Sequence, residues 1–329
     1  MPVSTRSDPE VQKTAELSIL IVSWNCKRML ADCLDSLRDQ LSSYRHEIIV
    51  VDNASSDGTS EMIRRNYPDV VFIESGANLG FARGNNLALA VTHGKYIFLI
   101  NPDVVVVSDC FRNMLQYLEE HREVGMMGPQ IVGSDGAIQR SCMREPTLWN
   151  QLCRALALDR FATRSRTFAG YLMGDFQHDA IREVEILNGC FWLVRREALQ
   201  QVGPLDDRFW MYGEDLDWCR RFRAAGWKIV FFPEAQTVHY GGGSSKQASL
   251  FCYVQMQRAD LQYWRKYHGL LSCWCYWALL WFANAWRAGV VAILYFARRS
   301  RNCETRLRLK RHLACVRHLY INKYSSDSQ

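Results

Sequence analysis

The sequence predicts an α/β fold built on a mostly parallel, doubly wound sheet. Between Leu17 and Asn101, four short runs are almost entirely apolar, and segments with helical spacing separate them. Continuous apolar runs of this length are typical of parallel strands that are buried on both faces. Each run also ends in polar residues, at the edge where open α/β sheets bind their ligands. The sequence therefore predicts an α/β domain with a ligand site at this edge.

The predicted elements alternate along the first hundred residues. Strands are predicted at 17–23, 47–53, 70–74 and 96–101, and helices at 29–40, 58–66 and 84–92. Residues 133–183 are less regular. Regular patterns return with a glycine-interrupted strand at 184–195, a helix at 214–225, and strand patterns at 228–232 and 234–239. The alternation of strand and helix predicts that helices cover both faces of the sheet.

The composition favours a folded protein that stays in a reducing compartment. Apolar residues make up 48% of the 329-residue chain, which is enough for a sizeable core. No secretory signal pattern opens the chain. The 12 cysteines contain no Cys-x-x-Cys pair and are scattered through apolar runs, as expected of reduced cysteines used as small hydrophobes.

The C-terminal region predicts a contact with a membrane. Residues 270–297 are apolar for longer than the roughly 20 residues that span a bilayer. Asn284 and Arg287 interrupt this run on one helical face, and tryptophans and tyrosines are frequent within it. These features favour a helix or helical hairpin in the plane of the cytoplasmic leaflet over a clean span. A buried helix of a soluble protein remains an alternative.

A basic stretch follows the apolar run. Residues 298–317 carry eight Arg or Lys residues against Glu304 alone, within a net charge of +6 for the whole chain. Because this stretch comes directly after a tryptophan-rich apolar segment, an anionic membrane surface is a better partner for it than nucleic acid.

Candidate chemistry gathers at three acidic positions and one histidine. Asp52 ends the second predicted strand. Asp103 comes shortly after the fourth, behind Asn101-Pro102. The sequence Glu214-Asp215-Leu216-Asp217 opens a predicted helix beside aromatic residues. Each has a simpler alternative, namely a helix cap, a turn aspartate and a favourable helix-dipole interaction. His239 follows a strand and precedes a glycine run, which makes it a candidate metal ligand. No Gly-x-Gly-x-x-Gly and no P-loop accompanies the strands, which argues against dinucleotide and NTPase sites.

Five blocks in a fixed order resemble the family 2 glycosyltransferases with a GT-A fold, particularly the rhamnosyltransferase-like members that build bacterial cell-surface polysaccharides. The resemblance covers roughly residues 17–267. The blocks are VSWNC (22–26), VVDNASSDGT (50–59), NLGFARGNN (78–86), LINPDVVV (99–106), and a long block from LNGCFWLVRREAL through FWMYGEDLDWCRRFRAAGW to VHYGGGS (187–244).

The resemblance implies a role for each matching position. Nucleotide-sugar binding falls to Ser23, Asn25, Asp52, Asn53, Asn78, Gly80, Arg83, Asn101 and Asp103. A divalent cation, Mg²⁺ or Mn²⁺, would be held by Asp103 and His239. Asp215 would be the catalytic base, supported by Glu214. Acceptor binding is expected at Trp210, Tyr212, Trp218, Arg140 and Arg144, with residues 139–146 and 171–179 shaping the sugar pocket. The first acid of the family's Asp-x-Asp metal motif is replaced here by Asn101.

The resemblance also implies an inverting, metal-dependent enzyme that transfers one sugar to a lipid-linked glycan acceptor. The leading donor is dTDP-rhamnose. A UDP-hexose or UDP-galactofuranose donor is an alternative, and a non-catalytic sugar-nucleotide-binding membrane scaffold is an alternative of a different class. The expected location is the cytoplasmic face of the bacterial inner (plasma) membrane, with a homodimer left open.

The predicted domain layout follows these patterns. A flexible N-terminus (1–15) precedes a catalytic GT-A domain (16–250), which divides into a nucleotide-binding half (16–130) and an acceptor-binding half (131–250). A helical membrane-associated region (251–324) and a short tail (325–329) complete the chain.

Overall fold

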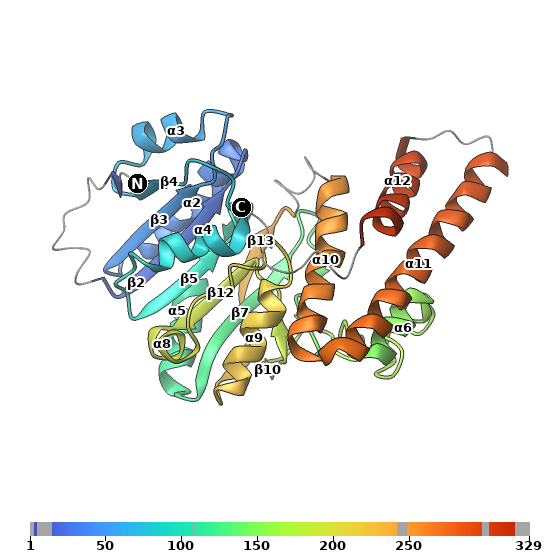
Figure 1. Cartoon of the computed structure of the whole chain (residues 1–329). Coiled ribbons are helices and arrows are strands. Elements are labelled where there is room, and N and C mark those ends of the chain that lie inside the picture. Colours follow the sequence, from blue (N-terminus) through green and yellow to red (C-terminus); the bar gives the residue numbers. More distant parts are fainter. Residues whose placement is uncertain (1–2, 5–14, 108, 242–248, 298–302, 320–329) are drawn as a thin grey trace. The chain divides into compact units, whose positions relative to one another are not determined.

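Most strands of the computed structural model form one large mixed sheet (Figure 1). The structure describes residues 3–4, 15–107, 109–241, 249–297 and 303–319. The predicted N-terminus and tail lie largely or wholly outside these residues, as do Gly242, Gly243, Arg298, Arg299 and Arg301. Contacts within the chain divide it into two units. Unit 1 comprises residues 1–144, 176–210 and 214–244, and unit 2 comprises residues 145–175, 211–213 and 245–329.

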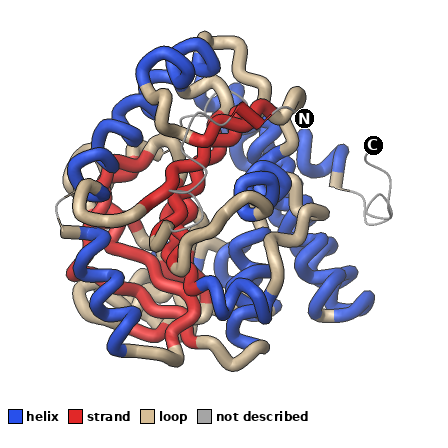
Figure 2. The backbone as a smooth tube through the Cα atoms, turned by 90° about the vertical axis from the view of Figure 1, so that its left-hand side faces the viewer, coloured by secondary structure: helices blue, strands red, loops and turns tan. Residues whose placement is uncertain are grey.

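The first four predicted strands are confirmed, and they lie side by side in unit 1. They are β2 (Leu17–Ser23), β3 (His46–Asp52), β4 (Val71–Glu74) and β5 (Tyr96–Ile100), and their mutual pairings, β4–β3–β2–β5, are all parallel. Three helices connect them, namely α2 (Lys27–Leu41), α3 (Thr59–Asn66) and α4 (Gly80–Leu89). The sheet is therefore of the mostly parallel type that the sequence predicts, and Figure 2 shows its strands as one continuous band.

The two faces of β2 bury against different helices. Ile19 and Ile21 belong to a core cluster with Leu30 of α2 and Phe111 of α5 (Cys110–Glu120). Val22 faces the other way, so close to Gly84 of α4 that a Cβ there would lie 2.8 Å from its Cγ1. This alternation explains why the run is apolar at nearly every position.

The second half of the sheet contains the antiparallel strands. The order continues from β5 through β12 (Phe191–Arg195), β7 (Val124–Val132) and β13 (Lys228–His239) to β10 (Arg182–Glu183). β12 runs antiparallel to both neighbours, whereas β7 and β13 are parallel. The prediction of a single strand at 184–195 is wrong, because the structure has two strands here, interrupted at Asn188-Gly189. Its first part, β11 (Ile186–Leu187), pairs with β9 (Cys142–Met143) in a separate two-stranded sheet.

Shorter elements complete unit 1. The strands are β1 (Val3–Ser4), which pairs with β4, β6 (Val104–Val106), which pairs with β13, and β8 (Ile138–Gln139), which pairs with β7. The helices are α8 (Arg196–Val202) and α9 (Glu214–Ala224). α9 confirms the predicted helix, and β13 joins the two predicted strands into one, with a register shift between Phe232 and Gln236.

Unit 2 is helical. Its elements are α6 (Leu148–Ala155), α7 (Leu158–Phe161), α10 (Ser249–Tyr267), α11 (Gly269–Ala297) and α12 (Cys303–His318). Residues 145–175 cluster with these C-terminal helices, although the sequence analysis assigned them to the catalytic domain. α11 is long and apolar enough to cross a membrane, and only 17% of its apolar window is buried inside the protein. Within the described residues most of this window is exposed, which disfavours the alternative of a fully buried soluble helix.

Gly80 permits a close backbone approach that fixes the start of α4. Its φ is +80°, and a Cβ at this position would lie 2.0 Å from the carbonyl oxygen of Trp210. The same oxygen accepts a 2.8 Å hydrogen bond from the N–H of Phe81. A side chain here would therefore separate α4 from the loop before α9.

We predict that Gly80→Ala destabilises the protein far more than Gly76→Ala. Both glycines have positive φ, but a Cβ at Gly76 (φ +74°) has no atom within 4 Å. Gly76→Ala should cost only the strain of a left-handed alanine, roughly 1 kcal/mol, and Gly80→Ala should add a steric clash. Urea denaturation of both variants measures the difference. Equal losses would contradict the close approach.

Candidate active site

The predicted polar residues gather at the carboxyl edge of the parallel strands. Ser23 and Asp52 end β2 and β3 and are register partners, and Asn101 directly follows β5, the other neighbour of β2. Ser23 and Asp52 are almost fully buried, at 0% and 2% exposure. The parallel register therefore places residues from three separate sequence blocks along one edge, as expected for a ligand site in an open α/β sheet.

Asp52 and Asn53 each keep one hydrogen-bond acceptor without a partner. Asp52 Oδ2 accepts from the N–H of Ser55 (3.0 Å), and Asn53 Nδ2 donates to the carbonyl of Gly80 (2.9 Å). Their Oδ1 atoms are buried and have no hydrogen-bond donor among the described residues. Because buried polar atoms are nearly always satisfied, two neighbouring orphaned acceptors indicate a site that a ligand or water completes.

The other predicted nucleotide-sugar residues hold the loops around this edge. Asn25 has positive φ (49°) and its Oδ1 accepts from the N–H of Ser56 at 2.7 Å. Asn78 Oδ1 accepts from the N–H of Gly80 at 3.1 Å, and the carbonyl of Asn78 accepts from the indole N–H of Trp210 at 3.4 Å. Arg83 is exposed and lies 3.3 Å from Asp207. Asn25 and Asn78 thus stabilise backbone turns through hydrogen bonds. Arg83 instead has an exposed cationic side chain.

Asp103 and His239 meet through backbone pairing. β6 follows Asp103 at once and pairs antiparallel with the end of β13, so that Val104 is the register partner of His239. The N–H of Tyr240 donates to the carbonyl of Asp103 (3.0 Å). As a result, Asp103 Oδ1 lies 3.3 Å from His239 Nε2, although the two residues are far apart in the sequence.

Gln139 determines which nitrogen of His239 faces Asp103. Its Nε2 donates to the carbonyl of His239 (2.9 Å), so its Oε1 is the atom that lies 3.0 Å from His239 Nδ1. Nδ1 must then carry the proton, and in the neutral imidazole Nε2 points a lone pair at the carboxylate of Asp103. Two facing acceptors require a proton or a cation between them. This donor set fits a divalent cation that takes its remaining ligands from a diphosphate.

The protein alone does not supply a complete metal-binding cage. In the ranges that the structure describes, no three His, Cys, Asp or Glu side chains converge closely enough to hold a metal ion. Asp103 and His239 are therefore two ligands at most, which agrees with the replacement of the first motif acid by Asn101.

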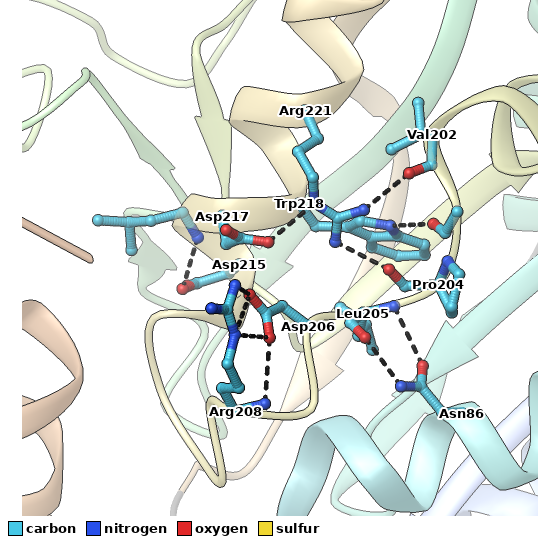
Figure 3. Close-up of polar contacts among 12 residues, drawn as sticks. Asn86, Val202, Pro204, Leu205, Asp206, Arg208, Asp215, Asp217, Trp218 and Arg221 are labelled. Carbon is cyan, nitrogen blue, oxygen red and sulfur yellow. Dashed lines mark hydrogen bonds and ion pairs between the residues drawn. The ribbon is translucent and has the colours of Figure 1, made fainter. Parts of the chain in front are cut away.

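Three acids in the first turn of α9, Glu214, Asp215 and Asp217, have different environments, and Figure 3 shows the contacts of Asp215 and Asp217. Asp217 is fully buried and pairs with Arg221, whose Nε lies 2.8 Å from Asp217 Oδ2. Arg221 also donates to the carbonyls of Val202 and Pro204, at 2.9 and 2.8 Å. Asp217 therefore anchors α9 to the preceding loop.

The carboxyl groups of Glu214 and Asp215 lie close enough for the charge of one to affect the pKa of the other. Burial raises the pKa of Glu214 well above its ordinary value, and the neighbouring charges of Asp215 and Asp217 raise it further. Glu214 Oε2 is buried and has no hydrogen-bond partner in the described structure. Asp215 is partly exposed, and its Oδ1 accepts from the N–H of Leu216 (2.9 Å). Burial and the neighbouring acids therefore favour a protonated Glu214 beside the partly exposed Asp215.

Cys190 links the two halves of the site. Burial raises the pKa of its thiol to about 12, and the charges of Asp103 and Asp215 both contribute to the increase. The carbonyl of Cys190 accepts from the N–H of Asn101 at 2.9 Å. Both carboxylates therefore lie within electrostatic reach of one buried residue at the start of β12. The sequence analysis did not identify this residue, because a single cysteine in an apolar run carries no distinguishing signal.

The predicted acceptor residues are less uniform. Trp218 is fully buried, packs against Trp192 with ring centroids 5.3 Å apart, and donates to the carbonyl of Gly203 at 3.0 Å. Its indole is therefore unavailable to a ligand in this structure and contributes to the packing of α9. Trp210 is partly buried. Tyr212 belongs to unit 2 and has a positive φ of 68°.

Arg140 and Arg144 flank β9, whose partner β11 packs against α9. Arg140 is exposed and Arg144 is partly buried. Both arginines therefore lie in sequence next to a strand pair that packs beside α9, the helix that carries Asp215.

The mixed sheet, with polar residues at the carboxyl edge of its parallel strands, has the GT-A fold. Residues 18–203, more than half of the chain, match the family model described as glycosyl transferase family 2. The chain belongs to that family.

Similar proteins include several rhamnosyltransferases. The chain is 30% identical over 209 residues to the N-acetylglucosaminyl-diphospho-decaprenol L-rhamnosyltransferase of Mycobacterium tuberculosis, covering 60% of this chain and 67% of the relative. It is 26% identical over 239 residues to the rhamnosyltransferase WbbL of Escherichia coli, covering 68% and 82%. A solved mannosyltransferase of Pyrobaculum calidifontis, in complex with GDP-Man and Mn²⁺, has 16% identity and a TM-score of 0.52 over 96% of this chain and 90% of its own. That last likeness concerns the fold.

We predict that Glu214→Gln makes the protein more stable relative to wild type as the pH rises from 5 to 8. Above the ordinary carboxyl pKa, the unfolded chain releases a proton that folded Glu214 keeps, so the stability of the wild type falls as pH rises through this window. Glutamine mimics the protonated acid and does not titrate. The difference in free energy of unfolding, measured by urea denaturation, should grow by up to about 1.4 kcal/mol per pH unit.

The Asp215→Asn background provides the control for this measurement. It removes one of the charges that raise the pKa of Glu214, so the drift with pH should shrink. A difference that does not change with pH would show that Glu214 is ionised in the folded protein.

Proposed function

We propose that this family 2 glycosyltransferase is an inverting, metal-dependent rhamnosyltransferase that moves one sugar from dTDP-rhamnose to a lipid-linked glycan acceptor. The observation that carries the proposal is the 3.3 Å approach of Asp103 Oδ1 to His239 Nε2 next to the carboxyl edge of the parallel strands. The choice of sugar and of acceptor is supported by the names of the relatives, a diphospho-decaprenol rhamnosyltransferase and a second rhamnosyltransferase.

Donor binding is proposed at the carboxyl edge of the parallel strands. Asp52 offers a carboxylate oxygen without a donor, which suits the ring N–H of a thymine or uracil base. Asn53 offers a second such acceptor. The remaining residues proposed to contact or frame the nucleotide sugar are Ser23, Asn25, Asn78, Gly80, Arg83 and Asn101. Thymine and uracil present the same N–H here, so the sugar and the nucleotide must be identified by experiment.

Asp103 and His239 are proposed to hold Mg²⁺ or Mn²⁺ together with the diphosphate. The imidazole lone pair and the carboxylate already face one another at 3.3 Å, and Gln139 keeps the imidazole in that orientation. When bound, a divalent cation supplies positive charge that stabilises the departing nucleoside diphosphate.

Asp215 is proposed to remove the proton from the acceptor hydroxyl. An ordinary aspartate is a weak base, so the proton moves as the bond from the hydroxyl oxygen to the anomeric carbon forms. One base and a single displacement invert the anomeric carbon. Glu214, protonated beside it, can donate a hydrogen bond to the same acceptor without competing for the proton. Trp210, Tyr212, Arg140 and Arg144 are proposed to position the acceptor.

The membrane-associated helices of unit 2 are proposed to place the enzyme at the cytoplasmic face of the bacterial plasma membrane. The 18-residue apolar window of α11, only 17% of it buried, and the excess of basic residues in and before α12 support this location. A lipid-linked acceptor would meet the enzyme there. A homodimer is compatible with the proposal but is not required by it.

We predict sugar release from dTDP-rhamnose in the presence of acceptor lipid and Mn²⁺ or Mg²⁺, and little from UDP-glucose, UDP-galactose or UDP-galactofuranose. Chelation should abolish the reaction. Product release measured across these four donors, with and without metal, tests the donor and the metal requirement together. Preference for a UDP-sugar would replace the donor, and the absence of any donor binding would favour a non-catalytic scaffold.

His239→Ala and Gln139→Leu separate the metal site from the nucleotide site. Mn²⁺ should tighten dTDP binding to the wild type, and this enhancement should be lost in His239→Ala. In Gln139→Leu it should weaken by roughly 10- to 100-fold, as expected when the partner of a ligating histidine is removed. Calorimetry with and without Mn²⁺ measures both. An undiminished enhancement in His239→Ala would exclude this residue as a ligand.

We predict that Asp215→Asn lowers turnover by roughly 10²- to 10⁴-fold, the range for loss of a general base. Donor affinity should be largely retained, because Asp215 is not among the residues proposed to contact the nucleotide sugar. Asp217→Asn is the matched control, since it breaks the buried pair with Arg221. Its loss of activity should follow its loss of folded protein. Normal turnover in Asp215→Asn would remove it as the base.

A further inference from the structure

Exposed apolar side chains are concentrated in unit 2. Of the 21 large hydrophobic side chains that are exposed in the described residues, only Ile138, Ile181 and Tyr240 lie in unit 1. The other 18 lie in unit 2, although unit 2 is the smaller unit. Soluble surfaces rarely gather apolar groups in this way unless they bind another apolar surface.

Part of this surface lies outside α11, in the segment that contains α6 and α7. The exposed side chains of this segment are Leu148, Trp149, Leu156, Phe161 and Phe168. Phe161 ends α7 and is 89% exposed, more than any other large hydrophobic residue described, and α7 has no buried residue at all. Folding of unit 2 therefore gains nothing from the apolar character of Phe161.

Three exposed arginines flank Phe161. They are Arg160, Arg164 and Arg166, and none of them forms an ion pair with a carboxylate in the described residues. The single acid between Leu156 and Phe168 is Asp159, which is partly buried. This segment therefore exposes an aromatic ring and three arginines close to it in sequence, none of them in an ion pair within the described residues.

The α6–α7 segment is attached to the middle of α11. Arg287 donates from NH2 to the carbonyls of Arg154 (2.8 Å) and Ala155 (3.2 Å), the last residues of α6. Leu156 follows them directly. α6 and α11 therefore lie side by side within unit 2 (Figure 1), although more than a hundred residues separate them in the sequence.

α11 turns its polar residues inward and its apolar residues outward. Asn284 is 1% exposed and donates to Gln257 Oε1 on α10 at 2.7 Å, while its Oδ1 lies 2.9 Å from His312 Nδ1 on α12. Phe282, Trp286 and Ile293 are 56%, 64% and 68% exposed. This arrangement is the reverse of a water-facing helix and suits a helix that contacts lipid.

We propose that residues 156–168 form a second membrane-insertion surface, continuous with the outward face of α11. Phe161 enters the acyl region of the bilayer, and Arg160, Arg164 and Arg166 bind the phosphates of anionic lipids. The uncompensated charge argues for an anionic bilayer over a second copy of the chain, because unit 2 carries a further basic helix in α12 that would repel it. The inference rests on the proposed membrane location and adds the residues that insert.

Flotation of the full-length protein with phosphatidylcholine vesicles, with and without phosphatidylglycerol, tests this proposal. Phe161→Ser should weaken binding to both vesicle types, roughly tenfold or more. The triple variant R160Q/R164Q/R166Q should weaken binding only to the phosphatidylglycerol vesicles, by roughly fivefold for each arginine. Ile181→Ser and R112Q/R122Q, on exposed residues of unit 1, are the matched controls and should bind as wild type does.

Hydrogen exchange provides a readout that needs no variant. Vesicles should protect the amides of 156–168 and leave those of 133–140 unchanged.

The outcomes distinguish the inference from the proposed membrane location. If the wild type floats but Phe161→Ser floats equally and 156–168 stays unprotected, α11 alone makes the membrane contact and this inference fails. If the wild type does not float, the proposed membrane location fails with it. A dimer that Phe161→Ser dissociates would instead assign the surface to a second copy. The assay needs no sugar donor, so its outcome is independent of the transferase proposal.

Discussion

The antiparallel pairing of β6 with the end of β13 is the constraint on which the site depends. β6 is three residues long, and it begins directly after Asp103. By pairing with Thr237–His239, it brings a loop at the end of the nucleotide-binding strands to the last strand of unit 1. The backbone hydrogen bonds of this pairing place the carboxylate of Asp103 near the imidazole of His239. The fold does not need a contact between the two side chains. The backbone therefore preorganises the proposed metal site.

The acids of α9 show how one helix terminus supports three functions. The helix dipole favours negative charge at this end, but three carboxylates within four residues exceed what it can stabilise, at most about 1 kcal/mol each at the surface. The protein resolves this by pairing Asp217 with Arg221 and by burying Glu214 so that it keeps its proton. Asp215 is left as the partly exposed acid of the three.

The sequence predicts the first half of the fold closely and the second half poorly, for a physical reason. Strands β2 to β5 are buried on both faces, so their apolar runs mark them within one or two residues. β9 and β11 are each two residues long and pair with one another across a long stretch of sequence, which leaves no local pattern. The same limit applies to the site. The position of Asp52 follows from the end of a strand, whereas the meeting of Asp103 and His239 was expected only from the family resemblance. Gln139 as the partner of His239, and Cys190 between the two acids, have no sequence signal. Trp218 shows the opposite error, because an aromatic residue beside acids can equally belong to the core.

Arg287 changes how the apolar helix should be understood. From sequence alone, an arginine near the middle of a bilayer costs roughly 3 kcal/mol, which favours a helix in the plane of the leaflet over one that spans. In the structure its guanidinium donates to two main-chain carbonyls at the C-terminal end of α6. That helix end carries partial negative charge, so it accepts hydrogen bonds from the guanidinium group and stabilises the cation.

The side-chain amide of Asn284 likewise has hydrogen-bond partners in Gln257 and His312. The polar residues of α11 therefore belong to the interior of unit 2, and the surface it offers to lipid is more apolar than its sequence suggests. The cost that argues against deep insertion of α11 falls accordingly. In the proposed membrane contact, the depth of unit 2 therefore depends on the exposed residues around α11, including the arginines beside Phe161, rather than on Arg287.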